Sequence, residues 1–299
     1  MHMPSHIFTR LGLWQESIRS NLAAAAAGLA FSQKSFPGST WSEQIHALDY
    51  LEYSYLQLAE DREAHQVVDQ AAAVVKTVPE DMKAAYALAA IPARYALERR
   101  RWVEAKAIAL HPAVAWARYP WTEAIVWFAR ALGAARSGAP TAAREAVERL
   151  AAIERSLEES EPYWASEVEV QRLAAAAWLA HAERDDARAE RQMRAAADLE
   201  DGTEKHAVTP GPVLPARELY GDLLLELGRP ADAAREIEAS LLRAPNRFGG
   251  LAAAARAAHL AGDEIHARER WVELVALDEH AASGRSELVE ARAALAEAP

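Results

Sequence analysis

Four side chains near the start of the chain have the types and spacing of metal ligands. His2 and His6 are four residues apart, and Asp49 follows His46 by three residues. On a helix, residues at these spacings share one face, with Cβ atoms about 5–6 Å apart. Neutral imidazoles and a carboxylate are ligands for zinc, iron, nickel or copper. The pattern therefore predicts a divalent transition-metal site formed by His2, His6, His46 and Asp49.

Other interpretations of these residues stay open. Asp49 can orient the His46 ring through a hydrogen bond without touching a metal. A histidine pair without a metal-protease signature also occurs as a hydrogen-bonded or solvated pair, and chain ends often fray. Pro4 is compatible with the first turn of a helix, where its missing N–H is harmless. That placement puts His2 just outside the helix and is expected to weaken the geometry of the His2/His6 pair.

The composition excludes several classes of function. The 299 residues include no cysteine, which excludes disulfide bonds and thiolate sites. With 44 acidic and 33 basic residues the net charge is −11, which disfavours a nucleic-acid surface. The longest apolar run, residues 22–31, is too short for a membrane span of about 20 residues, and no secretory leader opens the chain. We therefore expect a soluble protein, cytoplasmic by default, without membrane insertion or nucleic-acid binding.

Internal repetition indicates which elements position these residues. Alanine-rich runs with few glycines and prolines favour closely packed helices. Near the end of the chain, residues 219–245 align with residues 253–279 at an offset of 34, which is the tetratricopeptide period. The residues that match are Gly228 with Gly262, Ala233 with Ala267, and Ile237 with Trp271.

The same order of a turn residue, an alanine and a bulky residue recurs upstream with decreasing clarity. We therefore predict an all-α fold, a right-handed tetratricopeptide-like superhelix (α-solenoid) of about seven helical hairpins, in a single domain over residues 1–299. The clearest repeats are 213–245 and 246–280, and prolines and glycines predict an irregular loop at 201–215. The expected turn residues are Gly12, Ala59, Arg100, Gly138, Ala182, Gly228 and Gly262.

Three longer motifs stand out: His-Met-Pro-Ser-His-Ile-Phe at residues 2–8, His-Ala-Leu-Asp-Tyr-Leu at 46–51, and Pro-Val-Leu-Pro-Ala-Arg-Glu-Leu-Tyr-Gly-Asp at 212–222. Together with Pro-Asn-Arg-Phe at 245–248, they resemble a group of bacterial tetratricopeptide-repeat proteins without an assigned activity. The resemblance implies a helical-repeat fold and no particular reaction. Longer members of that group carry a further block of His-rich and Trp-rich repeats, so the chain resembles their C-terminal portion.

The tetratricopeptide register predicts which side chains face the concave groove. When the turn residue is numbered 15, the first helix of each hairpin lines the groove through positions 2, 5, 9 and 12. This register brings the three histidines and Asp49 to one end of the groove, and the irregular loop can bring His206 to them by folding back. Charged side chains farther along suit the capture of a peptide or a small anion, and equally suit a solvated face. The predicted groove residues are Tyr53, Arg94, Arg172, His206, Glu218, Asp222 and Arg256.

Two functions from different classes follow from these patterns. The first is a scaffold whose concave groove binds a peptide, a protein segment or a small ligand, because helical-repeat arrays have no chemistry of their own. The alternative is a metal-binding protein or a metal-dependent enzyme, which requires the histidine nitrogens to converge on one point. Self-association through an uncapped terminal repeat is a third expectation if the chain is part of a longer one.

Overall fold

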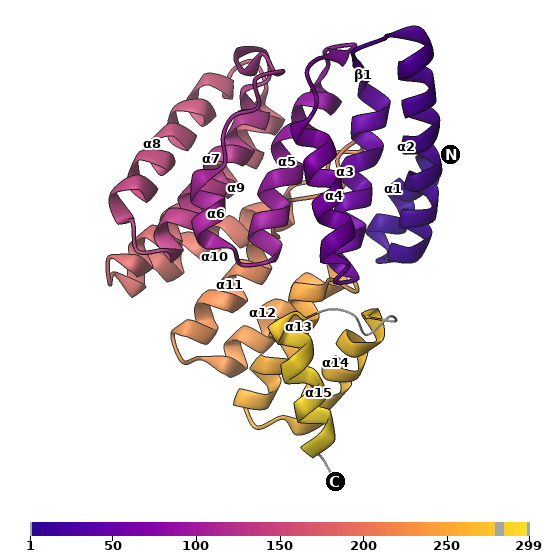
Figure 1. The fold of residues 1–299 in the computed structure, drawn as a ribbon. Helices are drawn as coiled ribbons and strands as arrows, with labels where there is room; N and C mark the ends of the chain where they lie inside the picture. Colours follow the sequence, from indigo (N-terminus) through magenta and orange to yellow (C-terminus); the bar gives the residue numbers. More distant parts are fainter. Residues whose placement is uncertain (1, 279–283, 298–299) are drawn as a thin grey trace.

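The protein is all-helical, as the sequence predicts. The computed structural model describes residues 2–278 and 284–297, and Figure 1 shows them as a succession of helical hairpins. Residues 279 and 280, at the end of the last predicted repeat, lie outside the described residues. The N-terminal elements are α1 (Met3–Arg10), α2 (Trp14–Ser35), β1 (Thr40–Trp41), α3 (Ser42–Gln57), α4 (Asp61–Ala72), β2 (Thr77–Val78), α5 (Met82–Glu98), α6 (Trp102–Ala107), the 3₁₀ helix η1 (Trp116–Arg118) and α7 (Pro120–Arg136).

The C-terminal elements continue the same alternation of paired helices. In the N-terminal part, β1 and β2 form a short parallel pair that links the loops before α3 and α5. The remaining helices are α8 (Pro140–Leu157), α9 (Pro162–Ala182), α10 (Asp186–Gly202), α11 (Ala216–Glu226), α12 (Pro230–Arg243), α13 (Phe248–Leu260), α14 (Glu264–Leu277) and α15 (Ser286–Glu297).

The hairpin turns place one residue in the left-handed backbone region. Helices often end this way, and glycine adopts the conformation without strain. Six of the predicted turn residues have positive φ, but the fifth turn residue is Arg184 (φ 67°) and not Ala182. The prediction was two residues early because α9 extends through Ala182. The confirmed turn residues are Gly12, Ala59, Arg100, Gly138, Gly228 and Gly262.

The residue five positions after each turn residue is buried against the partner helix. Because that position is alanine or serine in every hairpin, the two helices can approach closely. The fifth hairpin follows the same rule once its turn is set at Arg184, since Ala189 is buried and Ala187 is exposed. The buried residues at this position are Ser17, Ala64, Ala105, Ala143, Ala189, Ala233 and Ala267.

The two ends of the array meet, because α13 packs against α3. The Trp14 indole N–H donates a hydrogen bond of 2.6 Å to the carbonyl of Asn246, just before α13. The side-chain amide of Asn246 in turn donates to the carbonyl of Gly12 at 3.3 Å. The face of α3 that the sequence assigned to an open groove is therefore covered by the chain itself.

Buried ion pairs and hydrogen bonds connect α3 to α5 and to the start of α13. Arg94 on α5 donates to Asp49 (2.8 Å) and Glu52 (2.9 Å) on α3, and all three side chains are inaccessible to solvent. Next to them, Arg247 at the start of α13 binds three oxygens, at 2.6–2.9 Å, from three different helices. The acceptors of Arg247 are Tyr53 on α3, Glu98 on α5 and Glu218 on α11.

This network corrects the predicted groove. Tyr53, Arg94 and Glu218 were expected to line an open concave face, and the structure buries all three in mutual contacts. The register gave no information on the closure of the array. The other charged groove residues pair with protein neighbours: Arg172 with Glu154, Asp222 with Arg100, and Arg256 with Glu290.

Exposed apolar side chains gather on the first two helices. Met3 and Ile7 on α1, with Leu22, Leu29 and Phe31 on α2, are each more than two-fifths exposed. Self-association through this end stays a prediction. No helix in the described residues is long and apolar enough to cross a membrane.

Arg94 provides a test of the buried network. Replacement by methionine leaves the Asp49 and Glu52 carboxyls without their cation, so we expect a loss of about 3–5 kcal/mol in the free energy of unfolding. The control is Arg19→Met, which removes an exposed pair with Glu16 and should cost no more than about 0.5 kcal/mol. Urea unfolding followed by circular dichroism measures both. Equal stabilities of the two variants would contradict the importance of the network.

Candidate metal centre

His2 and His6 share one face at the start of α1. Pro4 occupies the first turn of this helix, and His2 is its N-cap residue. The sequence led us to expect a weakened pair in this arrangement, and that expectation was wrong. The backbone of His2 is itself helical, with φ −70° and ψ −41°, so the four-residue spacing still stacks the two rings.

The third histidine comes from a neighbouring helix. His46 lies on α3, and the ligand atoms of His2, His6 and His46 all lie within 4.8 Å of one another. We call these three residues the histidine triad. The His46 ring centroid is 4.5 Å from that of His2 and 5.7 Å from that of His6. The Tyr50 ring, one turn after His46, packs against all three imidazoles at centroid distances of 5.0, 4.8 and 5.3 Å.

A buried asparagine fixes the protonation of His2. The Asn21 amide nitrogen donates to the Ser17 carbonyl at 2.8 Å, which turns the amide oxygen towards His2. That oxygen lies 2.7 Å from Nδ1 of His2. Because an amide oxygen only accepts hydrogen bonds, Nδ1 of His2 must carry the proton. A neutral His2 ring therefore presents the lone pair of Nε2 to the triad.

The irregular loop fixes the protonation of His6 in the same way. Tyr50 donates its hydroxyl proton to the Val208 carbonyl at 2.9 Å, so its oxygen can only accept from His6 at 3.1 Å. Nδ1 of His6 also lies 2.9 Å from the Ala207 carbonyl. With two acceptors at Nδ1, the proton of a neutral His6 ring resides there, and Nε2 again carries the lone pair.

These two lone pairs face each other. The Nε2 atoms of His2 and His6 are 2.8 Å apart, and neither neutral ring has a proton at that position to share. Two acceptors at this distance repel unless a cation lies between or beside them. Hydrogen bonds from Nδ1 to protein oxygens are also the usual way in which metal-binding histidines are oriented. The arrangement therefore suits a metal ion.

Burial keeps the third ring neutral. His46 is only 4% exposed, and burial, with the nearby His2 and His6, lowers its pKa to about 2. Burial also lowers the pKa of His2. Neutral imidazoles have a free lone pair for a metal, so His2 and His46 need no deprotonation to bind one at neutral pH.

Two of the predicted site residues lie outside the triad. Asp49 was expected as a ligand, but its carboxylate accepts a hydrogen bond from Arg94 and is not part of the cluster that His2, His6 and His46 form, which corrects that prediction. The irregular loop does fold back to α1 and α3, and the groups that it contributes there are the carbonyls of Ala207 and Val208. The ring of His206 packs instead against Trp164, at a centroid distance of 4.8 Å.

The sequence interpretation missed Asn21, and it placed Tyr50 beside the histidine face without a role in the site. Tyr50 lies four residues after His46, and this spacing was available as a signal that it shares the histidine face. Asn21 carries no such signal, because its role depends on the return of α2 past the start of α1. The two loop carbonyls were equally hidden, since main-chain acceptors have no sequence signature.

Comparisons with family models and with curated proteins do not assign the chain to a family. No family model matches the chain, and no curated protein matches it with significance. The function therefore has to be argued from the triad and its surroundings.

The tautomers of His2 and His6 are a direct consequence of their hydrogen bonds. In chelator-treated protein at pH 7.5, we expect both rings as the Nδ1–H tautomer, because each Nδ1 faces an oxygen that only accepts. Long-range ¹H–¹⁵N correlation spectra of histidine side chains report the tautomer of each ring, and His65→Gln and His259→Gln variants assign exposed reference signals. An Nε2–H signal for either ring would contradict the facing lone pairs.

The buried His46 ring makes the metal-free protein sensitive to acid. Its pKa is about 2 in the folded protein, against about 6.5 when unfolded. Between these values only the unfolded state binds the proton, so stability falls as the pH drops below about 6.5. At about 1.4 kcal/mol per pH unit, we expect this group to cost about 2 kcal/mol at pH 5. Urea unfolding at pH 7 and pH 5 should show a shallower decrease for His46→Asn, and equal slopes would contradict the assignment.

Proposed function

We propose that this protein binds a divalent transition-metal ion through His2, His6 and His46. The observation that carries the proposal is the pair of Nε2 lone pairs 2.8 Å apart, with each Nδ1 occupied by a hydrogen bond to a protein oxygen. A histidine pair that served only to pack would place a proton between the two nitrogens. Here the surrounding acceptors take both protons, and a cation restores a favourable contact.

Three neutral imidazoles are a suitable donor set for zinc and its neighbours in the first transition series. At Zn–N distances of about 2.0–2.1 Å, tetrahedral ligands lie about 3.3 Å apart, so the two Nε2 atoms need to separate by about 0.5 Å. Rotation of the two rings about their side-chain bonds provides that change. Three protein ligands leave one coordination position for water or a substrate, which is the ligand count of catalytic zinc sites.

The surroundings of the triad favour a permanent site. Tyr50 packs against all three rings, and its hydroxyl donates a hydrogen bond to the carbonyl of Val208 in the loop. Asn21 is fully buried and orients His2. Such outer contacts hold ligand rings in place and reduce the entropy lost on binding.

We also infer that the hairpins form a tetratricopeptide-type superhelix. The inference is supported by the left-handed turn residue of each hairpin and by the buried small residue five positions later. A scaffold function that uses an open groove gains less support, because Tyr53, Arg94 and Glu218 are committed to buried contacts.

Metal titration tests the proposal. Calorimetric titration of zinc into untagged, chelator-treated protein should show one site per chain, with a Kd in the micromolar range or tighter. His46→Ala and His6→Ala each remove one of three ligands and should weaken binding at least 100-fold. Elemental analysis of the protein purified without chelator provides an independent measurement.

The matched controls are the exposed histidines of the same chain. His65→Ala and His259→Ala should retain the affinity of the parent, because neither residue is near the triad. Loss of binding in these variants would indicate weak, distributed binding of zinc to surface histidines. No binding by the parent of zinc, copper, nickel or iron would reject the metal-binding function.

A further inference from the structure

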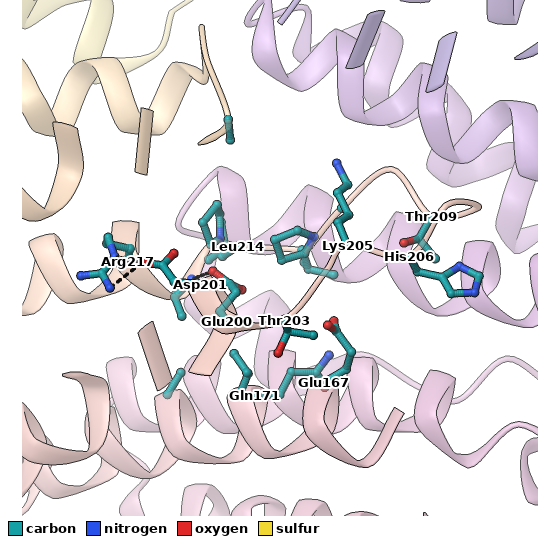
Figure 2. Close-up of a pocket in the computed structure, with 18 of the residues that line it drawn as sticks. Glu167, Gln171, Glu200, Asp201, Thr203, Lys205, His206, Thr209, Leu214 and Arg217 are labelled. Atoms are coloured by element: carbon teal, nitrogen blue, oxygen red, sulfur yellow. Dashed lines mark hydrogen bonds and ion pairs between the residues drawn. The ribbon is translucent and has the colours of Figure 1, made fainter. Parts of the chain in front are cut away.

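A cavity of about 550 Å³ lies between α9 and the irregular loop, residues 203–215. We call it the loop cavity. Figure 2 shows residues from α9, from the end of α10 and from the loop surrounding it. Its volume is in the range of small-molecule sites. The aromatic side chains that line it are Tyr86, Trp121, Phe128, Tyr163 and Trp164.

One face of α9 supplies both apolar and acidic parts of the loop cavity. Tyr163, Trp164, Glu167 and Gln171 all line it, and their spacings of three and four residues place them on the same side of the helix. Trp164 stacks on Trp121 of α7, with ring centroids 5.3 Å apart and the planes inclined by only 8°. An aromatic wall therefore lies next to the Glu167 carboxyl.

Two buried polar atoms on this wall have no protein partner. Among the described residues, neither the Trp121 indole N–H nor the Gln171 side-chain oxygen makes a hydrogen bond. Both residues line the loop cavity. Buried polar groups are nearly always paired, so a ligand or a water molecule in the cavity is a natural partner for these two atoms.

The charges around the loop cavity are unevenly compensated. Arg217 pairs with Asp198, Asp201 and Glu236, and Arg243 pairs with Asp201. Arg10, Glu204 and Lys205 also line the cavity. Glu167 has the Tyr163 hydroxyl and the charge of Lys205 as partners, and Glu200 accepts a hydrogen bond of 2.8 Å from the Ala216 N–H. In Figure 2 the Glu167 carboxyl points towards the loop, whereas the Lys205 amine extends away from that carboxyl.

Burial shifts the pKa values of the ionisable groups in the loop cavity towards their neutral forms. Burial raises the pKa of Glu167, and burial together with Glu167 raises the pKa of Glu200 to about 8. Burial also lowers the pKa of Lys205 to about 7. The protein therefore favours neutral groups here, and a bound cation would allow the carboxyls to ionise.

We propose that the loop cavity binds a small organic ammonium compound, with its cationic nitrogen next to Glu167 and its apolar part against the aromatic wall. Aromatic rings attract ammonium groups through their faces, and a carboxylate adds a charge-assisted hydrogen bond. The Gln171 oxygen is a further acceptor for the ammonium protons. This site is independent of the histidine triad, since the triad residues do not line it.

A set of ligands that differ only in charge tests the site. The probes are 2-phenylethylamine, the neutral 2-phenylethanol and the anionic 3-phenylpropanoate, titrated by calorimetry and by tryptophan fluorescence at pH 7.5. The amine should bind with a Kd below about 1 mM and at least 10-fold more tightly than the alcohol. Glu167→Gln should remove that preference, because the amide keeps the shape and loses the charge.

The matched control is Glu169→Gln on the same helix, whose side chain is 41% exposed and lies outside the cavity lining. It should bind the amine as the parent does. Three results would each overturn the proposal: tighter binding of 3-phenylpropanoate than of the amine, equal binding of the amine and the alcohol, or no binding of the amine. If Glu167→Gln does not fold, the order of the three probes in the parent protein still decides the outcome.

Discussion

The contact between α3 and its neighbours depends on two buried arginines. Arg94 and Arg247 are inaccessible to solvent, and together they bind oxygens from α3, α5 and α11. Removing charges from water is costly, so such a network persists only where several oxygens surround each guanidinium. Arg247 uses three nitrogens of its planar guanidinium for its acceptors, whereas Arg94 binds both carboxylates through Nη1. The network therefore sets the position of α3, and with it the position of His46.

The irregular loop connects the two candidate sites. The carbonyls of Ala207 and Val208 contact His6 and Tyr50 on one side, while His206 packs on Trp164 on the other. A further hydrogen bond of 2.8 Å runs from the Tyr86 hydroxyl to the Gly211 carbonyl. A loop of this length is rarely ordered without many contacts. Here tyrosine hydroxyls and a histidine ring bind its carbonyls, which replaces the hydrogen bonds that helix or sheet would provide.

Much of the fold was predictable because its determinants are local. A glycine or a short turn, followed five residues later by a small residue, recurs through the chain and identified six of the seven turns. The turn at Arg184 was placed two residues early because α9 extends through Ala182. The closure of α13 onto α3 was not predictable in the same way, since it depends on contacts such as Arg247 with Tyr53 across 194 residues. The groove prediction failed at that point, because Tyr53, Arg94 and Glu218 are buried in mutual contacts.

The site shows the same division between local and distant determinants. The pairing of His2 with His6 follows from helical spacing, and the approach of His46 follows from the adjacency of α1 and α3. The position of the proton on the His2 and His6 rings does not follow from local spacing. It is fixed by Asn21 and by two carbonyls of a loop some 200 residues away in sequence. A histidine cluster becomes a metal site only when its lone pairs point inward. The distant loop therefore decides the chemistry of side chains that the first residues of the sequence supply.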